Sequence, residues 1–323
     1  MYSHLLTDWY TIMAAIQHWL SGGDPYGRYL NRSGALVHAG AFAYPPPTLL
    51  LGGLLSPLPW AVSGVLMLLV SLFGFEYWTR STAGRTGLFW ALLWLPICQG
   101  FYIGQTTLLT LVCLMGAELC YARKHDRWAG ALLALALLKP HIIVLPAAWL
   151  LFVALRERRW QSLLSFGLVS LALWGGAALI AGPTIYAHWL SAISNYGPEL
   201  ATRSLLFPPL GPLLGLMAIA LWWRYGRGDV LGLLLLVNTL IYPLGVVYVA
   251  TGLAFVVIRW RRDWPFYPLA LSWVVAAVVT TARTPDTAAA LTQAIVATGL
   301  LAGLCPAIPW QHLLRLRGVP TRH

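Results

Sequence analysis

Residues 129–154 read AGALLALALLKPHIIVLPAAWLLFVA, and this stretch decides the fold because its 26 residues are apolar except at Lys139 and His141. About 20 apolar residues are enough for a helix to cross a bilayer. The Lys-Pro-His step divides the stretch into two shorter apolar runs. A lysine at mid-membrane costs roughly 2.5–3.5 kcal/mol on insertion scales. Lys139 is therefore expected either to bind an anion, such as a lipid phosphate, or to extend to the outer interface.

The whole chain shares this apolar character. Of its 323 residues, 59% are hydrophobic and only 10% are charged, and the mean hydropathy is +0.71. Soluble domains carry about 25% charged residues, so the composition excludes a soluble globular protein and a disordered one. Other apolar runs lie at 48–77, 87–99, 106–122, 161–181, 211–223, 229–258, 265–281 and 287–308. We predict an all-α, polytopic helical membrane protein with about 8–10 transmembrane or half-membrane helices.

A short amphipathic segment precedes these runs. In residues 9–20, WYTIMAAIQHWL, the apolar positions recur at helical spacing, but the segment is too short to span a bilayer. It is expected to lie on the membrane surface. The predicted organisation is a single integral membrane domain over residues 1–323. Its parts are an outer loop with the surface helix at 1–47, a first helical bundle at 48–181, a second outer loop at 182–210 and a second helical bundle at 211–323.

The basic residues predict the orientation. With residues 1–47 outside, 16 of the 21 lysines and arginines fall in inner loops and the C-terminal tail. The positive-inside rule accounts for this distribution and for the net charge of +11 without a nucleic-acid partner. The predicted inner segments are 79–86, 123–127, 156–160, 224–228, 259–263 and 309–323. We predict a multi-pass protein of the cell membrane whose catalytic face is extracytoplasmic.

A few polar residues that are costly in lipid mark the expected site. No phosphate-binding glycine loop and no metal-ligand spacing occurs in the sequence. A nucleotide-dependent enzyme and a metal site are therefore not expected. The polar candidates are Asp8, Asp24, Tyr26, Tyr44, Gln105, Lys139 and His141, with Arg203 in the second outer loop.

The order of short motifs along residues 8–160 carries a family resemblance. The motifs are Asp8, Gly22-Gly23-Asp24-Pro25-Tyr26, Tyr44-Pro45-Pro46, Gly104-Gln105, Gly130, Lys139-Pro140 and Arg156-Glu157-Arg158-Arg159-Trp160. In this order they resemble glycosyltransferase family 87, the mannosyltransferase-like membrane enzymes of the C-type glycosyltransferase fold. The family has a transmembrane helix before the aspartate, so the resemblance implies that this first helix is lacking here.

The resemblance implies transfer of a sugar, most often mannose, from a polyprenyl-phosphate donor to a hydroxyl of a lipid or glycan acceptor. An inverting transfer needs a base for the incoming hydroxyl. It needs no acid, because the phosphate leaves as a stable anion. Asp8 is the expected catalytic base, and no cofactor is expected besides the lipid-linked sugar donor. The expected substrate-binding residues are Lys139, Arg203, His141, Gln105, Asp24, Tyr26 and Tyr44, of which the first three are expected at the phosphate.

The same residue types also suit purely structural roles. These roles are an N-cap for Asp8, a turn cap for Asp24, packing for Tyr26 and His141, a helix cap for Gln105 and a solvated loop position for Arg203. Two competing functions fit the sequence as well, a transporter or lipid flippase built from broken helices and a truncated, inactive relative. A transporter would move its substrate without forming a covalent product.

Overall fold

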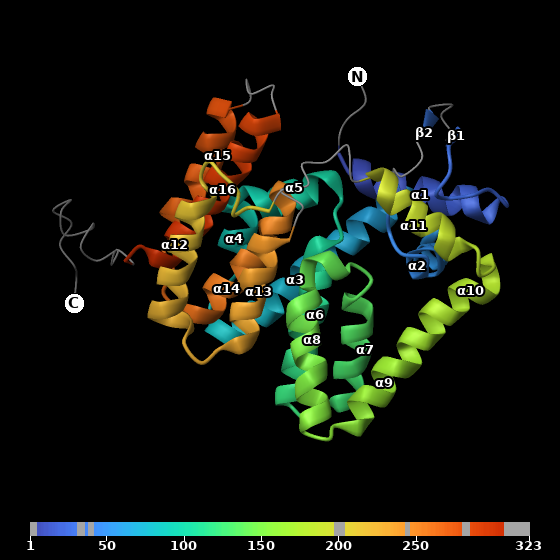
Figure 1. Ribbon diagram of the computed structural model, residues 1–323, viewed down its shortest axis with the longest axis horizontal. Coiled ribbons are helices and arrows are strands. Elements are labelled where there is room, and N and C mark those ends of the chain that lie inside the picture. The colour runs from blue at the N-terminus through green and yellow to red at the C-terminus, as the bar shows by residue number, and fades with distance from the viewer. Residues whose placement is uncertain are drawn as a thin grey trace, which may run out of the picture.

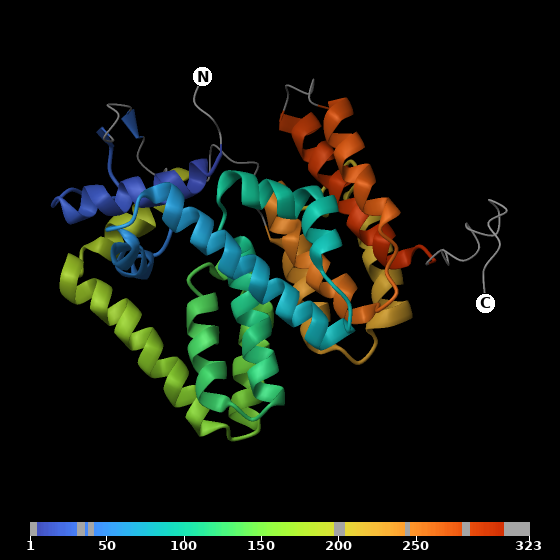
Figure 2. The same cartoon turned by 180° about the vertical axis from the view of Figure 1, so that it is seen from behind.

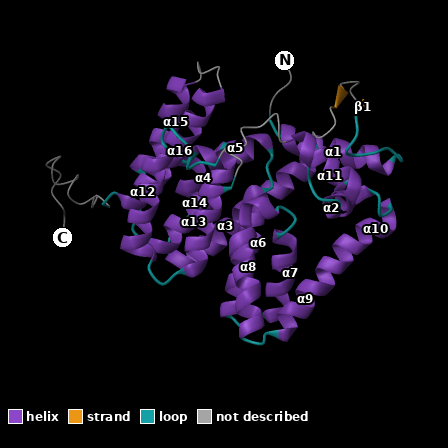
Figure 3. Cartoon of the chain, viewed as in Figure 1, coloured by secondary structure: helices purple, strands orange, loops and turns teal. Residues whose placement is uncertain are grey.

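The computed structural model describes residues 5–30, 36–37, 42–196, 204–242, 246–279 and 285–306. The regular secondary structure of the described chain is helical apart from one short antiparallel pair, β1 (Tyr29–Leu30) with β2 (Leu36–Val37) (Figure 3). The all-α prediction is confirmed. The first helices are α1 (Thr7–Leu20), α2 (Pro47–Leu55), α3 (Trp60–Ala83), α4 (Leu88–Leu93), α5 (Leu95–Ile103), α6 (Thr107–Ala122), α7 (Asp126–Ala136) and α8 (Pro140–Arg156). They are followed by α9 (Trp160–Ser170), η1 (Leu171–Gly175), α10 (Gly176–Ala181), α11 (Ile185–Tyr196), α12 (Gly211–Leu221), η3 (Trp222–Gly226), α13 (Val230–Ile241), η4 (Val247–Thr251), α14 (Gly252–Trp260), α15 (Tyr267–Val279) and α16 (Pro285–Leu304).

Helix α1 lies along one edge of the molecule beside α2 and α11, and it contacts α2, α3 and α5 (Figures 1 and 2). The predicted helix over 9–20 agrees with α1, which begins two residues earlier. Its apolar stripe is buried, including Ile12, Met13 and Ile16. On the same face, the indole nitrogen of Trp9 donates a 2.9 Å hydrogen bond to the Ser63 hydroxyl in α3. This arrangement agrees with a helix that lies on the bundle and does not cross a membrane.

Two described helical segments are long and apolar enough to cross a membrane, Trp60–Ala83 and Trp160–Ala181. A third candidate is the pair Leu95–Ile103 and Thr107–Ala122, which bends by 114° at its break. Five other apolar helices in the described chain are shorter, with 10–17 residues. The expected half-length helices therefore occur, and irregular backbone between them needs protein or water to satisfy its polar groups.

The segment from α9 through η1 to α10 packs on α7 along α9 and then diverges from α6, α7 and α8 toward α2 and α11 (Figure 1). Leu164, Leu171 and Leu179 on this segment are mostly exposed. An apolar helix without a protein partner on most of its surface is expected to face lipid. The sequence run 161–181 thus corresponds to one lipid-facing span with a single π-helical turn at η1.

The helices of the two predicted bundles share a hydrophobic core. Phe75 and Trp78 of α3 pack on Phe255 of α14, with ring centroids 5.1 and 4.7 Å apart. Trp94, between α4 and α5, donates a hydrogen bond of 3.3 Å to the Thr298 hydroxyl in α16. A smaller apolar cluster lies under α1 and includes Phe42 and Ile185. The core therefore connects segments that are far apart in the sequence.

The predicted inner loops gather at one end of the molecule, which we call the basic end. The turns α6–α7, α8–α9 and η3–α13 lie along the lower edge in Figure 1, while α1 lies along the upper edge. Arg85 donates to the Arg262 carbonyl at 2.8 Å, and Arg159 to the Tyr121 carbonyl at 2.9 Å. These contacts join loops that the positive-inside rule assigns to the same side.

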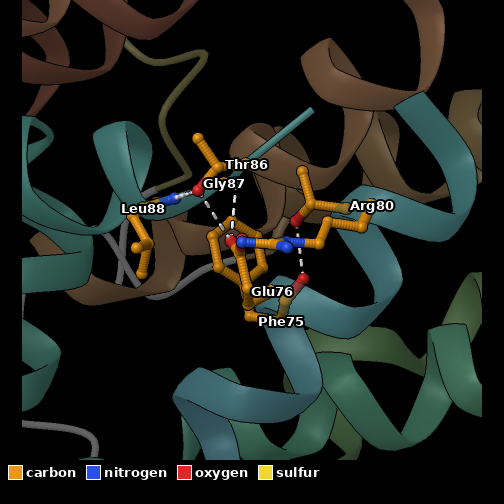
Figure 4. A network of polar contacts seen from close by, with 7 residues as sticks. Phe75, Glu76, Arg80, Thr86, Gly87 and Leu88 are labelled. Carbon is orange, nitrogen blue, oxygen red and sulfur yellow. Dashed lines mark hydrogen bonds and ion pairs between the residues drawn. The ribbon is translucent and has the colours of Figure 1, made fainter. Parts of the chain in front are cut away.

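Glu76 connects α3 to the loop before α4 at the basic end (Figure 4). Its carboxylate accepts hydrogen bonds from the Gly87 backbone N–H at 2.8 Å and the Thr86 hydroxyl at 3.1 Å. It also pairs with Arg80, one turn further along α3, at 2.6 Å. The Gly87 N–H belongs to the start of α4, where helices leave backbone donors unpaired. Glu76 therefore has a structural role.

Two predicted loops contain regular structure. The outer loop 182–210 includes helix α11, and the loop 1–47 includes the β1–β2 pair as well as α1. Trp189 of α11 donates to the Ala43 carbonyl at 3.1 Å. Helix α11 therefore packs on the N-terminal segment. Arg203 lies outside the described residues.

Candidate active site

The break between α5 and α6 creates the site. Gly104 ends α5 with a φ of +75°, and the backbone N–H of Gln105 bonds back to the Gly100 carbonyl at 2.7 Å. A side chain at residue 104 would meet Trp9 Cβ at 2.8 Å and Leu6 Cα at 3.2 Å. Glycine therefore permits both the left-handed turn and the close approach of α1.

The start of α1 is attached to this break. The Leu6 backbone N–H donates to the Tyr102 carbonyl at 2.6 Å. Asp8 follows in the first turn of α1 and is not its N-cap, because that position belongs to Leu6 and no described side chain caps the helix. The Asp8 carboxylate instead accepts a hydrogen bond from the Gln105 side-chain amide. Asp8 is thus held by a residue 97 positions away in the sequence.

Gln105 stands between the two charged groups of the site. Its Nε2 donates to Asp8 Oδ2, and its Oε1 accepts from Lys139 Nζ. The Tyr44 hydroxyl also donates to Oε1, at 3.1 Å. Gln105 is 6% exposed, and a buried amide that uses both its donor and its acceptor is held in one orientation. We call the group Asp8, Gln105, Lys139, Tyr44 and Thr107 the Asp8 site.

Lys139 enters this group from the turn between α7 and α8, where it is the residue before Pro140 at the first position of α8. Its side chain is 4% exposed, so it does not extend to the interface. Besides Gln105, its Nζ donates to the Thr107 hydroxyl at 3.0 Å and the Tyr44 hydroxyl at 3.4 Å. It also lies 5.3 and 5.1 Å from the ring centres of Tyr44 and Tyr248, within range of a cation–π attraction.

Tyr44 and Tyr26 form an aromatic support beside the site. The Tyr26 hydroxyl donates to the Tyr44 carbonyl at 2.9 Å. Phe42 lies between their rings, with centroids 5.3 Å from Tyr26 and 5.8 Å from Tyr44. Tyr26 itself is buried, and its burial raises the pKa of its phenol, so its hydroxyl remains a hydrogen-bond donor at neutral pH. Tyr26 therefore holds the backbone at Tyr44 in place.

Burial raises the pKa of the Asp8 carboxyl above its usual range. The hydrogen bond from Gln105 and the positive charge of Lys139 act in the opposite direction, because both favour the ionised form. Asp8 lies on α1, outside the membrane-spanning helices. A carboxylate with a raised pKa is a stronger base than an exposed one.

Among the described residues, Asp24, His141 and Tyr26 were expected at the site and lie outside this group, Tyr26 as the support of Tyr44. Asp24 accepts from the Tyr26 backbone N–H at 3.0 Å, as a turn residue does, and pairs with His188 at 3.2 Å. The His141 ring lies 5.5 Å from that of Tyr242, and its buried Nε2 has no hydrogen-bond partner among the described residues. The position of Arg203 is not described.

Sequence reasoning did not identify two residues that contact Lys139. Thr107 and Tyr248 are almost fully buried and lie in apolar runs. Thr107 follows Gln105 by two positions at the start of α6, and this closeness to Gln105 in the sequence could have identified it as a site residue. Tyr248 lies in η4, and no charge marks it in the sequence.

Comparison with known families supports the resemblance found in the sequence. The family model for glycosyltransferase family 87 matches residues 42–285. The chain belongs to glycosyltransferase family 87. No curated protein and no solved structure matched it. The match includes Tyr44, Gln105 and Lys139 and extends beyond residue 160, whereas Asp8 and Asp24 precede it. This family 87 member is thus a membrane glycosyltransferase. Because the match does not include Asp8, only the hydrogen bond from Gln105 places Asp8 beside the matched residues.

Proposed function

We propose that the chain transfers a sugar, mannose in the first instance, from a polyprenyl-phosphate donor to a hydroxyl of a lipid or glycan acceptor, with inversion. The family supports the glycosyltransferase part of this proposal. The observation that carries the rest is the pairing of Asp8 with Lys139 through Gln105 at the break between α5 and α6. It brings a carboxylate and a buried ammonium group together beside the non-helical turn between α5 and α6.

Asp8 is the proposed base. The acceptor oxygen attacks the anomeric carbon, its proton passes to the Asp8 carboxylate, and the bond from that carbon to the phosphate oxygen breaks. The electron pair of this bond leaves with the polyprenyl phosphate, which is stable as an anion. General-base assistance of this kind contributes about 10²- to 10⁴-fold to a rate. The raised pKa of Asp8 suits this role.

Lys139 can support the reaction in two ways. Its positive charge favours the ionised form of Asp8, and its bond to Gln105 fixes the amide that holds Asp8. It could also contact the leaving phosphate, if a phosphate oxygen replaced the Tyr44 hydroxyl, the longest of its three contacts. The geometry supports the first role more directly, because Nζ is buried and already has three hydrogen-bond partners. We therefore propose Lys139 mainly as a positioning residue.

We further propose that the Asp8 site faces the extracytoplasmic side. The support is its position opposite the basic end, which the positive-inside rule places in the cytoplasm (Figure 1). Tyr44 and Gln105 are the proposed sugar contacts. Arg203 remains a proposed phosphate ligand, although its side chain lies outside the described residues.

The test is a transfer assay with membranes that contain the chain, radiolabelled polyprenyl-phosphate mannose and an extracted lipid acceptor fraction. We expect wild-type membranes to form a labelled product. In the Asp8→Asn variant, at equal protein level, the transfer rate should fall about 10²- to 10⁴-fold. The matched control is Asp126→Asn at the basic end, which should keep the wild-type rate. Full activity in Asp8→Asn would remove the base assignment, and label that crosses the membrane without a product would indicate transport.

A further inference from the structure

A pocket lies at the opposite end of α1 from Asp8. It has a volume of about 500 Å³ and opens between the end of α1 with its following loop and the connection from α10 to α11. Asp8 and Trp19 are eleven residues apart on α1, which separates them by about 16 Å at 1.5 Å per residue. The pocket is therefore distinct from the Asp8 site. Its lining comprises Trp19, Leu20, Gly22, Gly23, Asp24, Pro25, Ile180, Ala181, Thr184, Ile185 and His188.

The polar side of the pocket is held in a fixed geometry. Gly22 turns the chain with a φ of +89°, and a side chain at residue 23 would meet the His18 ring at 2.1 Å. The turn brings Asp24 opposite α11. There, Oδ1 accepts from the Tyr26 N–H at 3.0 Å and Oδ2 lies 3.2 Å from His188 Nδ1. Each carboxylate oxygen has a second lone pair, so both can accept a further hydrogen bond.

The apolar side continues into the lipid-facing surface. Ile180 is 67% exposed and belongs to α10, at the end of the long apolar segment that begins at Trp160. Leu20, on the other wall, is half exposed. A ligand in this pocket can therefore hold its polar part against Asp24 and His188 while an attached chain follows the apolar surface toward the lipid.

The charge of the pocket selects among possible ligands. Asp24 contributes a carboxylate, and no lysine or arginine of the described chain lines this pocket. A phosphate or sulfate group would meet like charge there, whereas sugar hydroxyls can donate to a carboxylate. Trp19 adds a large apolar surface beside these polar groups, and pockets that combine aromatic walls with a few placed polar groups are typical of small-molecule sites.

We propose that this pocket binds the neutral saccharide headgroup of a membrane-anchored acceptor. The inference rests on the proposed transferase function and adds a subsite for a non-reacting part of the acceptor. Binding energy from such a part can orient the reacting hydroxyl toward Asp8. Asp24, His188 and Trp19 are the residues that carry this binding.

The experiment measures binding of radiolabelled octyl α-D-mannopyranoside, below its micelle concentration, to the full chain in lipid nanodiscs. We expect saturable binding that octyl sulfate does not displace. Asp24→Ala and His188→Ala should each weaken the affinity at least tenfold, and both side chains are more than 40% exposed, so the fold should tolerate the changes. Asp126→Ala is the matched control and should stay within twofold of wild type, as should Asp8→Asn.

A photoreactive diazirine analogue of the same glycoside locates the site without any substitution. Labelled peptides should contain residues 19–25 or 180–188. Unchanged affinity in both Asp24→Ala and His188→Ala, equal displacement by octyl sulfate, or label confined to other peptides would each overturn the proposal. Loss of transfer in Asp8→Asn with retained glycoside binding separates the two sites. If wild-type membranes form no product while the pocket is labelled, the proposed transfer fails and the saccharide site remains.

Discussion

The two ends of the molecule hold their charges in different ways. At the basic end, carboxylates meet arginines directly: Arg259 pairs with Glu118 at 2.6 Å and also with Asp229, and Arg159 pairs with Asp126 at 3.2 Å. At the Asp8 site, an uncharged amide stands between the carboxylate and the ammonium group. A direct ion pair gives a carboxylate a charged partner, whereas at Asp8 burial raises the pKa of the carboxyl and the hydrogen bond from the amide offsets this rise only in part.

This difference indicates different tasks. Direct pairs at the basic end connect α6, α13 and α14 and thereby stabilise the fold. The arrangement around Asp8 keeps a carboxylate available for a proton while a nearby cation limits the energetic cost of its charge. The contrast between the ends makes predictions that separate effects on catalysis from effects on stability.

After the loss expected for Asp8→Asn, the largest expected effect is also on catalysis and comes from Lys139→Gln. The variant loses the charge that favours ionised Asp8 and the bond that fixes Gln105. Hydrogen bonds to charged groups are worth about 1.5–3 kcal/mol, so kcat should fall about 10- to 150-fold. Steady-state kinetics of sugar transfer provide the measurement. The matched control, Arg159→Gln at the basic end, should keep kcat in the folded protein. A rise in donor KM with unchanged kcat would instead identify Lys139 as a direct phosphate ligand.

The next effect is on stability and comes from Arg259→Gln. The change leaves Glu118 and Asp229 without their common partner, and all three side chains are about one-fifth exposed. Breaking a fully buried pair costs about 3–5 kcal/mol and an exposed one less than 1, so about 1–3 kcal/mol is expected here. Thermal denaturation followed by size-exclusion chromatography measures the loss, with Arg156→Gln as the control. A wild-type midpoint for Arg259→Gln would show that the basic end does not depend on this pair.

A smaller effect is expected in the pH profile of Gln105→Leu. If Asp8 is the base as proposed, transfer needs its ionised form, so the rate falls as the pH drops through the Asp8 pKa, which burial has raised. The Gln105 bond lowers that pKa, so its removal raises the pKa further and moves the acid limb of kcat to higher pH. Measurement of kcat across the acid range tests this. An acid limb that stays in place or moves to lower pH would contradict the bridging role of Gln105.

The sequence predicted the elements on which both ends are built. Apolar periodicity located α1, the Lys139-Pro140 step located the turn between α7 and α8, and the arginines identified the loops of the basic end. These features are local, because each depends on spacing or charge within about 20 residues. The expected site residues Asp8, Gln105, Lys139 and Tyr44 do lie together, yet no local pattern indicates that Gln105 bridges the charges.

The bridge depends on the 114° bend between α5 and α6 and on contacts across 97 and 34 positions. Thr107 and Tyr248 were missed because a hydroxyl in an apolar run carries little signal beside a charge. Helix α11 was missed because its polar residues suggested a loop, although its buried Ile185 and Ala192 lie seven positions apart, on one helical face.

The smallest expected effect is on stability, and it compares the two contacts of Glu76 at the basic end: the ion pair with Arg80 and the hydrogen bond from the Gly87 N–H. Arg80 is 68% exposed on its side chain, and an exposed pair one helical turn apart contributes about 0.3–0.5 kcal/mol, so Arg80→Ala should hardly change the thermal midpoint. Glu76→Ala also leaves the Gly87 N–H at the start of α4 without its acceptor, which costs about 1 kcal/mol for comparable helix caps. Glu76→Ala should therefore lower the midpoint more than Arg80→Ala, and neither should change kcat. Equal losses would mean that the ion pair, and not the bond to the α4 backbone, is what Glu76 contributes. In that case this part of the basic end would depend on an ion pair, which would sharpen its contrast with the amide-mediated Asp8 site.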